Sequence, residues 1–166
     1  MILDNCEVEV LVKSIKDTSI IDKVIDAGRI MVAADSLGAS QIMIDKSVTY
    51  SKERKQFGRV IGSFQAVKHM CAEMTTDIQP CYSMVWYAAH CHDYIHEESR
   101  LMATQTKSHV SETASKIAKT ATEVHGGMGF TDDLGLHYWF KRIGLNRQIL
   151  GGIEINREEA AKVQNF

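Results

Sequence analysis

The stretch Glu53-Arg-Lys-Gln-Phe-Gly58 carries side chains suited to a phosphorylated ligand. It places two cations, an amide, an aromatic ring and a glycine close together. The guanidinium of Arg54 can bind phosphate oxygens through two hydrogen bonds, and the ring of Phe57 can lie against a base. Ser63-Phe-Gln65 follows at a short distance. The alternative interpretation is a solvated basic helix end, with Phe57 folded into the core.

A second stretch, Glu123-Val-His-Gly-Gly127, places two glycines directly after a long helical pattern. Glycines at such a position let a ligand approach the backbone closely, with amide N–H groups free to donate. The alternative is a simple helix C-cap formed by Gly126.

Two further pairs have the spacing of neighbours on one face of a helix. Asp26 and Arg29 would form an ion pair worth only a few tenths of a kcal/mol, so a structural role is as plausible as a binding role. His92 and His96 have the spacing of two metal ligands. No third ligand is suitably spaced, because the thiol and carboxylate nearby would point to other faces. We therefore expect ordinary polar helix-end residues there and no metal.

Three groups of motifs follow one another along the chain. They are Asp26–Arg29 with Leu37-Gly38, Tyr50–Gly58 with Ile61–Val67, and Glu123–Phe130 with Arg142. Together they resemble the signature of the acyl-CoA dehydrogenase family. The similarity runs from about residue 20 to the end and covers only the C-terminal helical domain of that family. The amino-terminal helical domain and most of the middle β-domain have no counterpart in it.

The resemblance implies contacts to flavin adenine dinucleotide (FAD) held by a neighbouring subunit. In the family, the arginine meets the pyrophosphate, the phenylalanine packs by the adenine, and a glutamine ends the contact. The corresponding residues here are Arg54, Gln56, Phe57, Phe64, Gln65, Glu123, Val124, His125, Gly126 and Gly127. The family usually has glutamine at position 123. A carboxylate near a pyrophosphate is unfavourable unless it is protonated or paired.

The resemblance assigns acyl-CoA binding to Asp26, Arg29 and Gly152. The catalytic base, in contrast, has no counterpart: Gly151 stands where the family usually has its glutamate, and Gly28 where a minority of members place it. Glu154 is the nearest carboxylate in sequence, but a place on the last helix would turn it elsewhere. The threonine that would bond the flavin also has no clear counterpart. We therefore expect no catalytic residue in this chain. Because loss of a positioned base costs about 10²–10⁴-fold in rate, the chain alone should be a poor dehydrogenase.

Two functions of different class follow from these residues. The favoured hypothesis is a domain of an acyl-CoA dehydrogenase-like flavoprotein; the family desaturates acyl-CoA thioesters at the α,β position and passes electrons to an electron-transfer flavoprotein. Some members form mixed oligomers in which one subunit type keeps the base and another keeps flavin contacts, and this chain fits the second role. It would self-associate to a dimer or tetramer, or join a homologous subunit. The alternative is a non-catalytic oligomerisation module of a flavoprotein complex.

The composition argues against other classes. With 166 residues, 45% hydrophobic and 24% charged, the chain has the make-up of one soluble domain. A net charge of −2 and a pI of about 6.4 argue against a nucleic-acid binder that works by bulk charge. No apolar run approaches the ~18 residues that a membrane span needs, and we expect no signal peptide. The four cysteines lack paired short spacing, so we expect reduced thiols in a cytoplasmic protein.

Long helices must position the candidate residues, and the spacing of apolar residues predicts an all-α, antiparallel four-helix bundle. Apolar residues recur with the helical period, and the chain has one proline, Pro80. The expected helices cover residues 21–52, 63–95, 97–124, 132 or 133 to 141, and 153–163. Ser63 is the expected N-cap of the second helix, Pro80 should kink or split it, and Gly126 should end the third.

The first residues differ from the rest. Val8-Glu-Val-Leu-Val12 alternates like a strand, so we expect residues 1–20 to be a short irregular or β segment, a remnant of the middle β-domain with its linker. Residues 21–166 would then form the C-terminal helical-bundle domain.

Overall fold

The computed structural model describes Asp4, Glu7 and residues 19–166, most of which are helical. Among these residues the α-helices are α1 (Ser19–Glu53), α2 (Gln65–Tyr94), α3 (His96–His125), α4 (Leu136–Gln148) and α5 (Ile153–Val163). Strands β1 (Lys55–Gln56) and β2 (Arg59–Val60) and the 3₁₀ helix η1 (Ile61–Ser63) connect α1 to α2, while a second 3₁₀ helix, η2 (Gly126–Phe130), follows α3. The strand expected over residues 8–12 lies outside the described residues.

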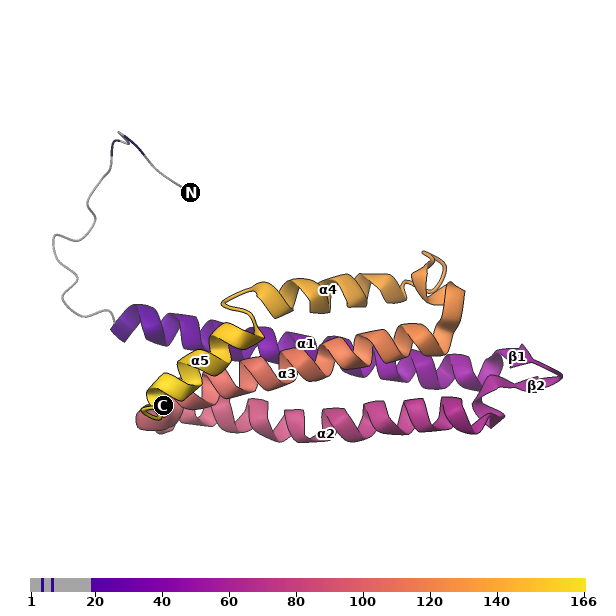
Figure 1. Ribbon diagram of the computed structural model, residues 1–166, viewed down its shortest axis with the longest axis horizontal. Coiled ribbons are helices and arrows are strands. Elements are labelled where there is room, and N and C mark those ends of the chain that lie inside the picture. Colours follow the sequence, from indigo (N-terminus) through magenta and orange to yellow (C-terminus); the bar gives the residue numbers. More distant parts are fainter. Residues whose placement is uncertain (1–3, 5–6, 8–18) are drawn as a thin grey trace.

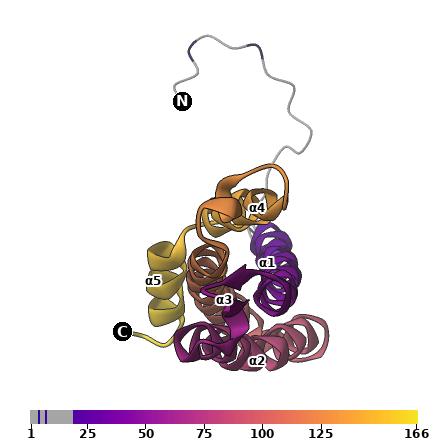
Figure 2. The same ribbon diagram turned by 90° about the vertical axis from the view of Figure 1, so that its right-hand side faces the viewer.

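Consecutive long helices run in opposite directions, joined by short connections (Figure 1). Viewed end-on, α3 lies in the middle, with α1, α2, α4 and α5 around it (Figure 2). The structure therefore confirms the predicted antiparallel four-helix bundle, to which α5 adds a further helix along α3. None of the helices in the described residues combines the length and the apolar character that a membrane-spanning segment needs.

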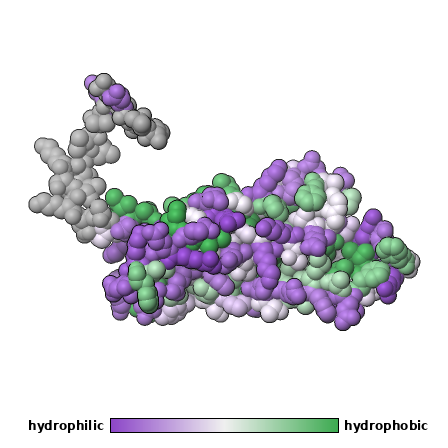
Figure 3. All heavy atoms as spheres, viewed as in Figure 1, coloured by the Kyte–Doolittle hydropathy of each residue, from purple (hydrophilic) through white to green (hydrophobic). Residues whose placement is uncertain are grey.

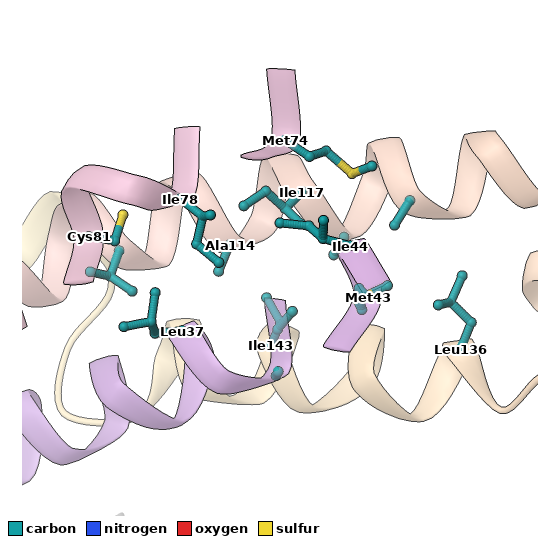
Figure 4. Close-up of a cluster of buried hydrophobic side chains, with 14 of the residues drawn as sticks. Leu37, Met43, Ile44, Met74, Ile78, Cys81, Ala114, Ile117, Leu136 and Ile143 are labelled. Atoms are coloured by element: carbon teal, nitrogen blue, oxygen red, sulfur yellow. The ribbon is translucent and has the colours of Figure 1, made fainter. Parts of the chain in front are cut away.

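The core lies where α1 to α4 meet (Figure 4). Its larger side chains are Leu37, Met43, Ile44, Met74, Ile78, Ile117, Leu136 and Ile143. Small residues allow α1 and α3 to approach closely, since Ala33 on α1 and Ala114 on α3 are fully or almost fully buried. Buried serines on α1, such as Ser40 and Ser47, donate hydroxyl hydrogen bonds to carbonyls one turn earlier, at 2.7 and 2.8 Å. These internal bonds allow a polar residue to lie in the core.

The start of α2 differs from the prediction. Ser63 lies in η1 and donates its hydroxyl to the Val60 carbonyl at 2.7 Å, so it does not cap α2. Phe64 takes the N-cap position without a side-chain hydrogen bond. The expected N-cap at Ser63 is therefore wrong.

The predictions for Pro80 and for the start of α4 also need correction. α2 runs unbroken through Pro80, so a split at this residue is wrong, whereas a kink there stays a prediction. Pro80 faces solvent. Water can therefore reach the carbonyl that loses its N–H partner to the proline ring. α4 begins at Leu136, after a turn ending at Gly135 with a φ of 60°, so Asp132 and Asp133 precede the helix instead of forming its first turn.

Candidate functional site

A tight hairpin places Arg54 just beyond the end of α1. The Arg54 amide donates to the Tyr50 carbonyl, and the Arg54 carbonyl accepts from the Ile61 amide, both at 2.8 Å. Between β1 and β2, Phe57 and Gly58 have φ values of 54° and 77°. Two successive left-handed residues are typical of the turn that best matches the twist of a two-residue hairpin. The hairpin therefore projects from α1 on a backbone that is bonded at its base.

The hairpin and the end of α3 form one hollow, although they are far apart in the sequence. Arg54 and Gln56 line a surface hollow of about 440 Å³ together with the whole 123–127 stretch. Tyr50, Ile61 and Met128 complete its lining. In Figure 1 both segments lie at the same end of the bundle. The structure thus brings together seven of the ten residues proposed for the cofactor.

His125 and Val124 are the buried residues of this hollow. The His125 ring stacks on Tyr50 with centroids 4.5 Å apart, and its Nδ1 bonds the Ala121 carbonyl at 2.7 Å. Val124 packs in the core. Burial lowers the pKa of His125, with Lys46 adding to the effect. A buried neutral imidazole and a core valine support the loop, while its backbone remains the surface that a ligand would meet.

The outer surface of the hollow fits a phosphate in two respects. Gly126, with φ 60°, and Gly127 would each carry an added Cβ without any atom within 4 Å, so their backbone is open to a ligand. The Arg54 side chain is exposed, and within the described residues its guanidinium has no ion pair. Glu123 is exposed in the same hollow and opposes an anion.

The aromatic residues of the hairpin lie outside the hollow. Phe57 is 90% exposed at the tip, so the alternative in which it folds into the core is wrong. Its ring meets Phe64 edge-on at 6.2 Å, and the Arg59 guanidinium lies 3.9 Å from the Phe64 centroid. Gln65 is exposed as the first residue of α2. Sequence reasoning missed Arg59, whose position opposite Gln56 follows only from the strand register.

Asp26 and Arg29 belong to a buried ion network in the first third of α1. The Asp26 carboxylate receives Nη1 of Arg29 at 3.0 Å and Nη1 of Arg100 at 2.9 Å. Burial raises the pKa of Asp26, although both arginines oppose this. Arg29 also donates Nε to the Leu150 carbonyl at 3.2 Å. The pair therefore ties α1 to α3 and to the loop after α4, which is more than the local pair expected from spacing.

Gly151 lies in that loop with a φ of 97°. A Cβ added there would meet Asn156 Nδ2 at 3.0 Å. Gly28 on α1 faces the same loop, where an added Cβ would lie 2.6 Å from Leu150 Cδ1. Gly152 is the N-cap of α5. Both positions that the resemblance reserves for a base are thus closely covered.

Glu154 is exposed in the first turn of α5. It lines a separate hollow with the cations Lys116, Lys119, Arg147 and Arg157, together with Glu112, Ser115 and Ile153. None of the acyl-CoA candidates lines that hollow. The position of Glu154 among cations gives no support for a substitute base.

The two candidate regions are well separated. Arg29 lies in the first third of α1, whereas Arg54 directly follows its last residue. The 25 residues between them span about 37 Å in a helix. Apolar surface gathers at the two ends of the bundle (Figure 3). The Arg54 hollow and the Asp26 network are therefore two separate regions of one chain.

The histidine pair does not share a helix face. α2 ends at Tyr94 and α3 begins at His96, so Ile95 breaks the spacing that the prediction assumed. His92 lies 3.3 Å from the Ser99 hydroxyl. Across the described residues, no group of three His, Cys, Asp or Glu side chains could hold a metal.

Comparisons with known proteins identify relatives for nearly the whole described chain. The model of the acyl-CoA dehydrogenase C-terminal domain matches residues 18–164. An acyl-CoA dehydrogenase of Mycolicibacterium smegmatis, IpdE2, is 35% identical over 126 residues, which is 76% of this chain and 39% of that protein. Subunit CarC of the caffeyl-CoA reductase-Etf complex of Acetobacterium woodii is 37% identical over 108 residues, covering 65% and 28%.

A solved structure agrees with this relationship. Butyryl-CoA dehydrogenase from Megasphaera elsdenii superposes with a TM-score of 0.84 at 25% identity, covering 91% of this chain and 39% of that one. The chain thus spans less than half the length of these relatives.

Proposed function

We propose, for a chain that belongs to the acyl-CoA dehydrogenase family through its C-terminal helical domain, that it contributes FAD contacts across a subunit interface without supplying the catalytic base. The observation that carries this proposal is the shared hollow of the hairpin and the α3 end. The chain would work within a flavoprotein that desaturates acyl-CoA thioesters at the α,β position.

The residues around the hollow suggest how they would hold the dinucleotide. Arg54 would bind the pyrophosphate, since its guanidinium is exposed and matches phosphate oxygens. The open backbone of Gly126 and Gly127 would let the ligand approach closely. Phe57 would offer its exposed ring to the adenine. The flavin, when bound, supplies the hydride acceptor for the desaturation.

The separation of the two sites favours sharing between subunits. The hollow lies about 37 Å along α1 from the Asp26–Arg29 stretch proposed for acyl-CoA. A ligand at the hollow and a substrate at that stretch would therefore serve two different active sites. This arrangement is expected where each subunit completes the cofactor site of its neighbour.

The base must then come from elsewhere. Glycine cannot abstract a proton, and both Gly28 and Gly151 are closely covered by neighbouring side chains. We propose that the α-proton is removed by a homologous subunit in a mixed oligomer. An oligomer made of this chain alone should not oxidise acyl-CoA at ordinary enzymatic rates.

An electron-transfer flavoprotein is the proposed electron acceptor. The A. woodii relative is named as a subunit of an Etf complex.

The decisive experiment compares Arg54→Gln with Lys52→Gln in assemblies reconstituted from this chain and a full-length homologous subunit. Lys52 is exposed in the last turn of α1, two residues before Arg54, so it controls for lost surface charge. Bound FAD is measured by its absorbance, and affinity by titration. Hydrogen bonds to charged groups are worth about 1.5–3 kcal/mol, so Arg54→Gln should weaken FAD binding by about 10–100-fold. Lys52→Gln should bind as the unchanged chain does.

Equal affinity of the Arg54→Gln and unchanged assemblies would remove Arg54 from the site. Absence of flavin from every assembly that contains the chain would overturn the proposed function itself.

The alternative, an assembly module without cofactor contacts, is favoured by one observation. Glu123 places an exposed carboxylate in the hollow that an anion should occupy. The variant Glu123→Gln distinguishes the two readings. It should raise FAD affinity several-fold if the hollow binds the pyrophosphate, and it should change only the oligomer, or nothing, if the chain serves assembly alone.

A further inference from the structure

Lys107 is fully buried in the middle of α3, and among the residues that the structure describes it has no carboxylate partner, which is rare for a buried lysine. Its Nζ donates to the Asn146 carbonyl at 2.9 Å and to the Ser111 hydroxyl at 3.1 Å. It also reaches the carbonyls of Arg147 at 3.4 Å and Gly151 at 3.5 Å. The ammonium thus faces oxygen atoms of the last turn of α4 and of the loop beyond it.

The loop of residues 149–152 accepts hydrogen bonds from side chains on three different helices. Arg29 of α1 donates to the Leu150 carbonyl at 3.2 Å, and Lys107 of α3 reaches the next carbonyl. Asn156 of α5 donates Nδ2 to the carbonyls of Gly151 at 2.8 Å and Gly152 at 2.9 Å. Three successive carbonyls are therefore held from three sides. In Figure 1 this loop turns back from α4 to α5.

The backbone of the loop needs such support. Leu150 has a φ of 60°, which is unfavourable for a residue with a side chain, and Gly151 has a φ of 97°. Conformations of this kind persist when the surrounding structure fixes them. The last carbonyls of α4 have no partner within the helix, and a cation at a helix C-terminus is favourable. One ammonium can therefore serve both the helix end and the loop.

We propose that Lys107 is a positioning residue that, with Asn156, fixes the 149–152 loop and keeps Leu150 against Gly28. The loop and Gly28 are the positions where the family resemblance would place the base, so Lys107 shapes that region by holding the Gly151 carbonyl. The proposal concerns the loop alone and stands whether or not the chain binds FAD.

The charges around Lys107 agree with this role. Burial first, and Arg29 second, lower the pKa of Lys107 to about 8. Asp26 is engaged by Arg29 and Arg100, and Glu159 of α5 pairs with Arg100. Arg147 of α4 offers its carbonyl. The ammonium is still the main form at pH 7, where it supplies three donors.

A titration of the unchanged chain tests the proposal. Carbon-13 shifts are recorded for the lysine side chains and for the backbone carbonyls between about pH 6.5 and pH 9.5. The Lys107 ε-carbon should titrate with a midpoint of about 8. The carbonyl carbons of Asn146 and Gly151 should follow the same midpoint, because the group that donates to them changes. Carbonyl shifts that ignore this midpoint would overturn the proposal.

Hydrogen exchange of the variant Lys107→Met separates positioning from general stability. The Ile149 amide, which donates to the Leu145 carbonyl, and the Asn156 amide, which donates to the Gly152 carbonyl, should lose protection by at least about tenfold, as expected for lost bonds to a charged group. Amides of residues 110–121 on α3 should stay within about twofold. The control Lys119→Met, at an exposed position on the same helix, should change neither.

Unchanged protection of the Ile149 and Asn156 amides in Lys107→Met, or an equal loss across all helices, would contradict a positioning role. If Lys107→Met does not fold, the titration of the unchanged chain decides alone.

Discussion

Burial of His125 beneath the hollow makes the free energy of unfolding depend on pH. Its ring is buried, stacked on Tyr50 and bonded to a carbonyl, and burial lowers its pKa below the ordinary value of 6.5. The folded state therefore binds a proton less readily than the unfolded state does. As the pH falls below about 6.5, the unfolded chain takes up the proton first, and the free energy of unfolding decreases.

We predict that this acid-dependent loss of stability is absent from His125→Phe. A phenylalanine keeps a ring against Tyr50 but cannot titrate, so the free energy of unfolding should depend less on pH between about pH 7 and pH 5. Urea denaturation at several pH values measures the difference. The control is His109→Gln, at an exposed position on the same helix. A slope in His125→Phe as steep as that of the unchanged chain would contradict the assignment to His125.

Residue types alone identified part of the candidate site. Arg54 and the glycines after α3 could be found because their chemistry is visible in the sequence, and the structure places them in one hollow. Lys107 could not be found in this way. Nothing in a helix rich in small polar residues signals that one lysine is buried, since its partners are backbone carbonyls from α4 and the loop. Backbone acceptors have no sequence signature, so only the packing of helices reveals them.

At the scale of elements, the hairpin between α1 and α2 carries an unfavourable residue at its tip. Phe57 adopts a φ of 54° and is 90% exposed, so it gains little from burial. A left-handed conformation costs a residue with a side chain about 1–2 kcal/mol, whereas asparagine adopts it more readily. Such strain at an exposed aromatic residue is expected where the ring serves a ligand.

We predict that Phe57→Asn stabilises the chain by about 0.5–1 kcal/mol, while FAD affinity decreases about tenfold or more. The conformational gain exceeds the roughly 0.5 kcal/mol of an exposed ring pair with Phe64. A stacked base is worth about 1–3 kcal/mol, which sets the loss of affinity. Chemical denaturation and FAD titration measure the two effects. Phe57→Ala should lose affinity equally but remain less stable than Phe57→Asn, and the reverse order would exclude turn strain as the cause.

Pro80 gives a second prediction at this scale. It lies within an unbroken α2 and faces solvent, so its ring contributes little packing. Proline is about 3 kcal/mol less favourable than alanine inside a helix, although it also restricts the unfolded chain by up to about 1 kcal/mol. Pro80→Ala should therefore raise the free energy of unfolding by about 1–2 kcal/mol, measured by denaturation. No gain, with Gln79→Ala as the neighbouring control, would show that the helix gains from the proline.

The helices were predictable in type and order, but not at all of their ends. Periodicity located α5 at residues 153–163 and the end of α3 at Gly126, where a glycine marks the stop. The start of α4 was placed too early, because acidic residues at 132 and 133 suit a first turn, whereas Gly135 turns the chain just before the helix. At α2 the serine signal misled, since its hydroxyl bonds backward to Val60. Capping residues therefore indicate a helix end only where the backbone around them is already known.

At the scale of the whole molecule, α1 to α4 share one core around α3, so the bundle should unfold as a unit. Ile117 is fully buried in that core, and Ile117→Ala should lower the free energy of unfolding by about 2–5 kcal/mol. Trp86 is exposed on α2, whereas Trp139 of α4 packs against the core. Because one transition should involve every helix, fluorescence and far-ultraviolet circular dichroism should give one common midpoint in the unchanged chain, and one common midpoint in Ile117→Ala. The control Ile155→Ala, at an exposed position on α5, should change stability by less than about 0.5 kcal/mol. Separate midpoints, or equal losses in the two variants, would show that the four helices do not depend on a common core.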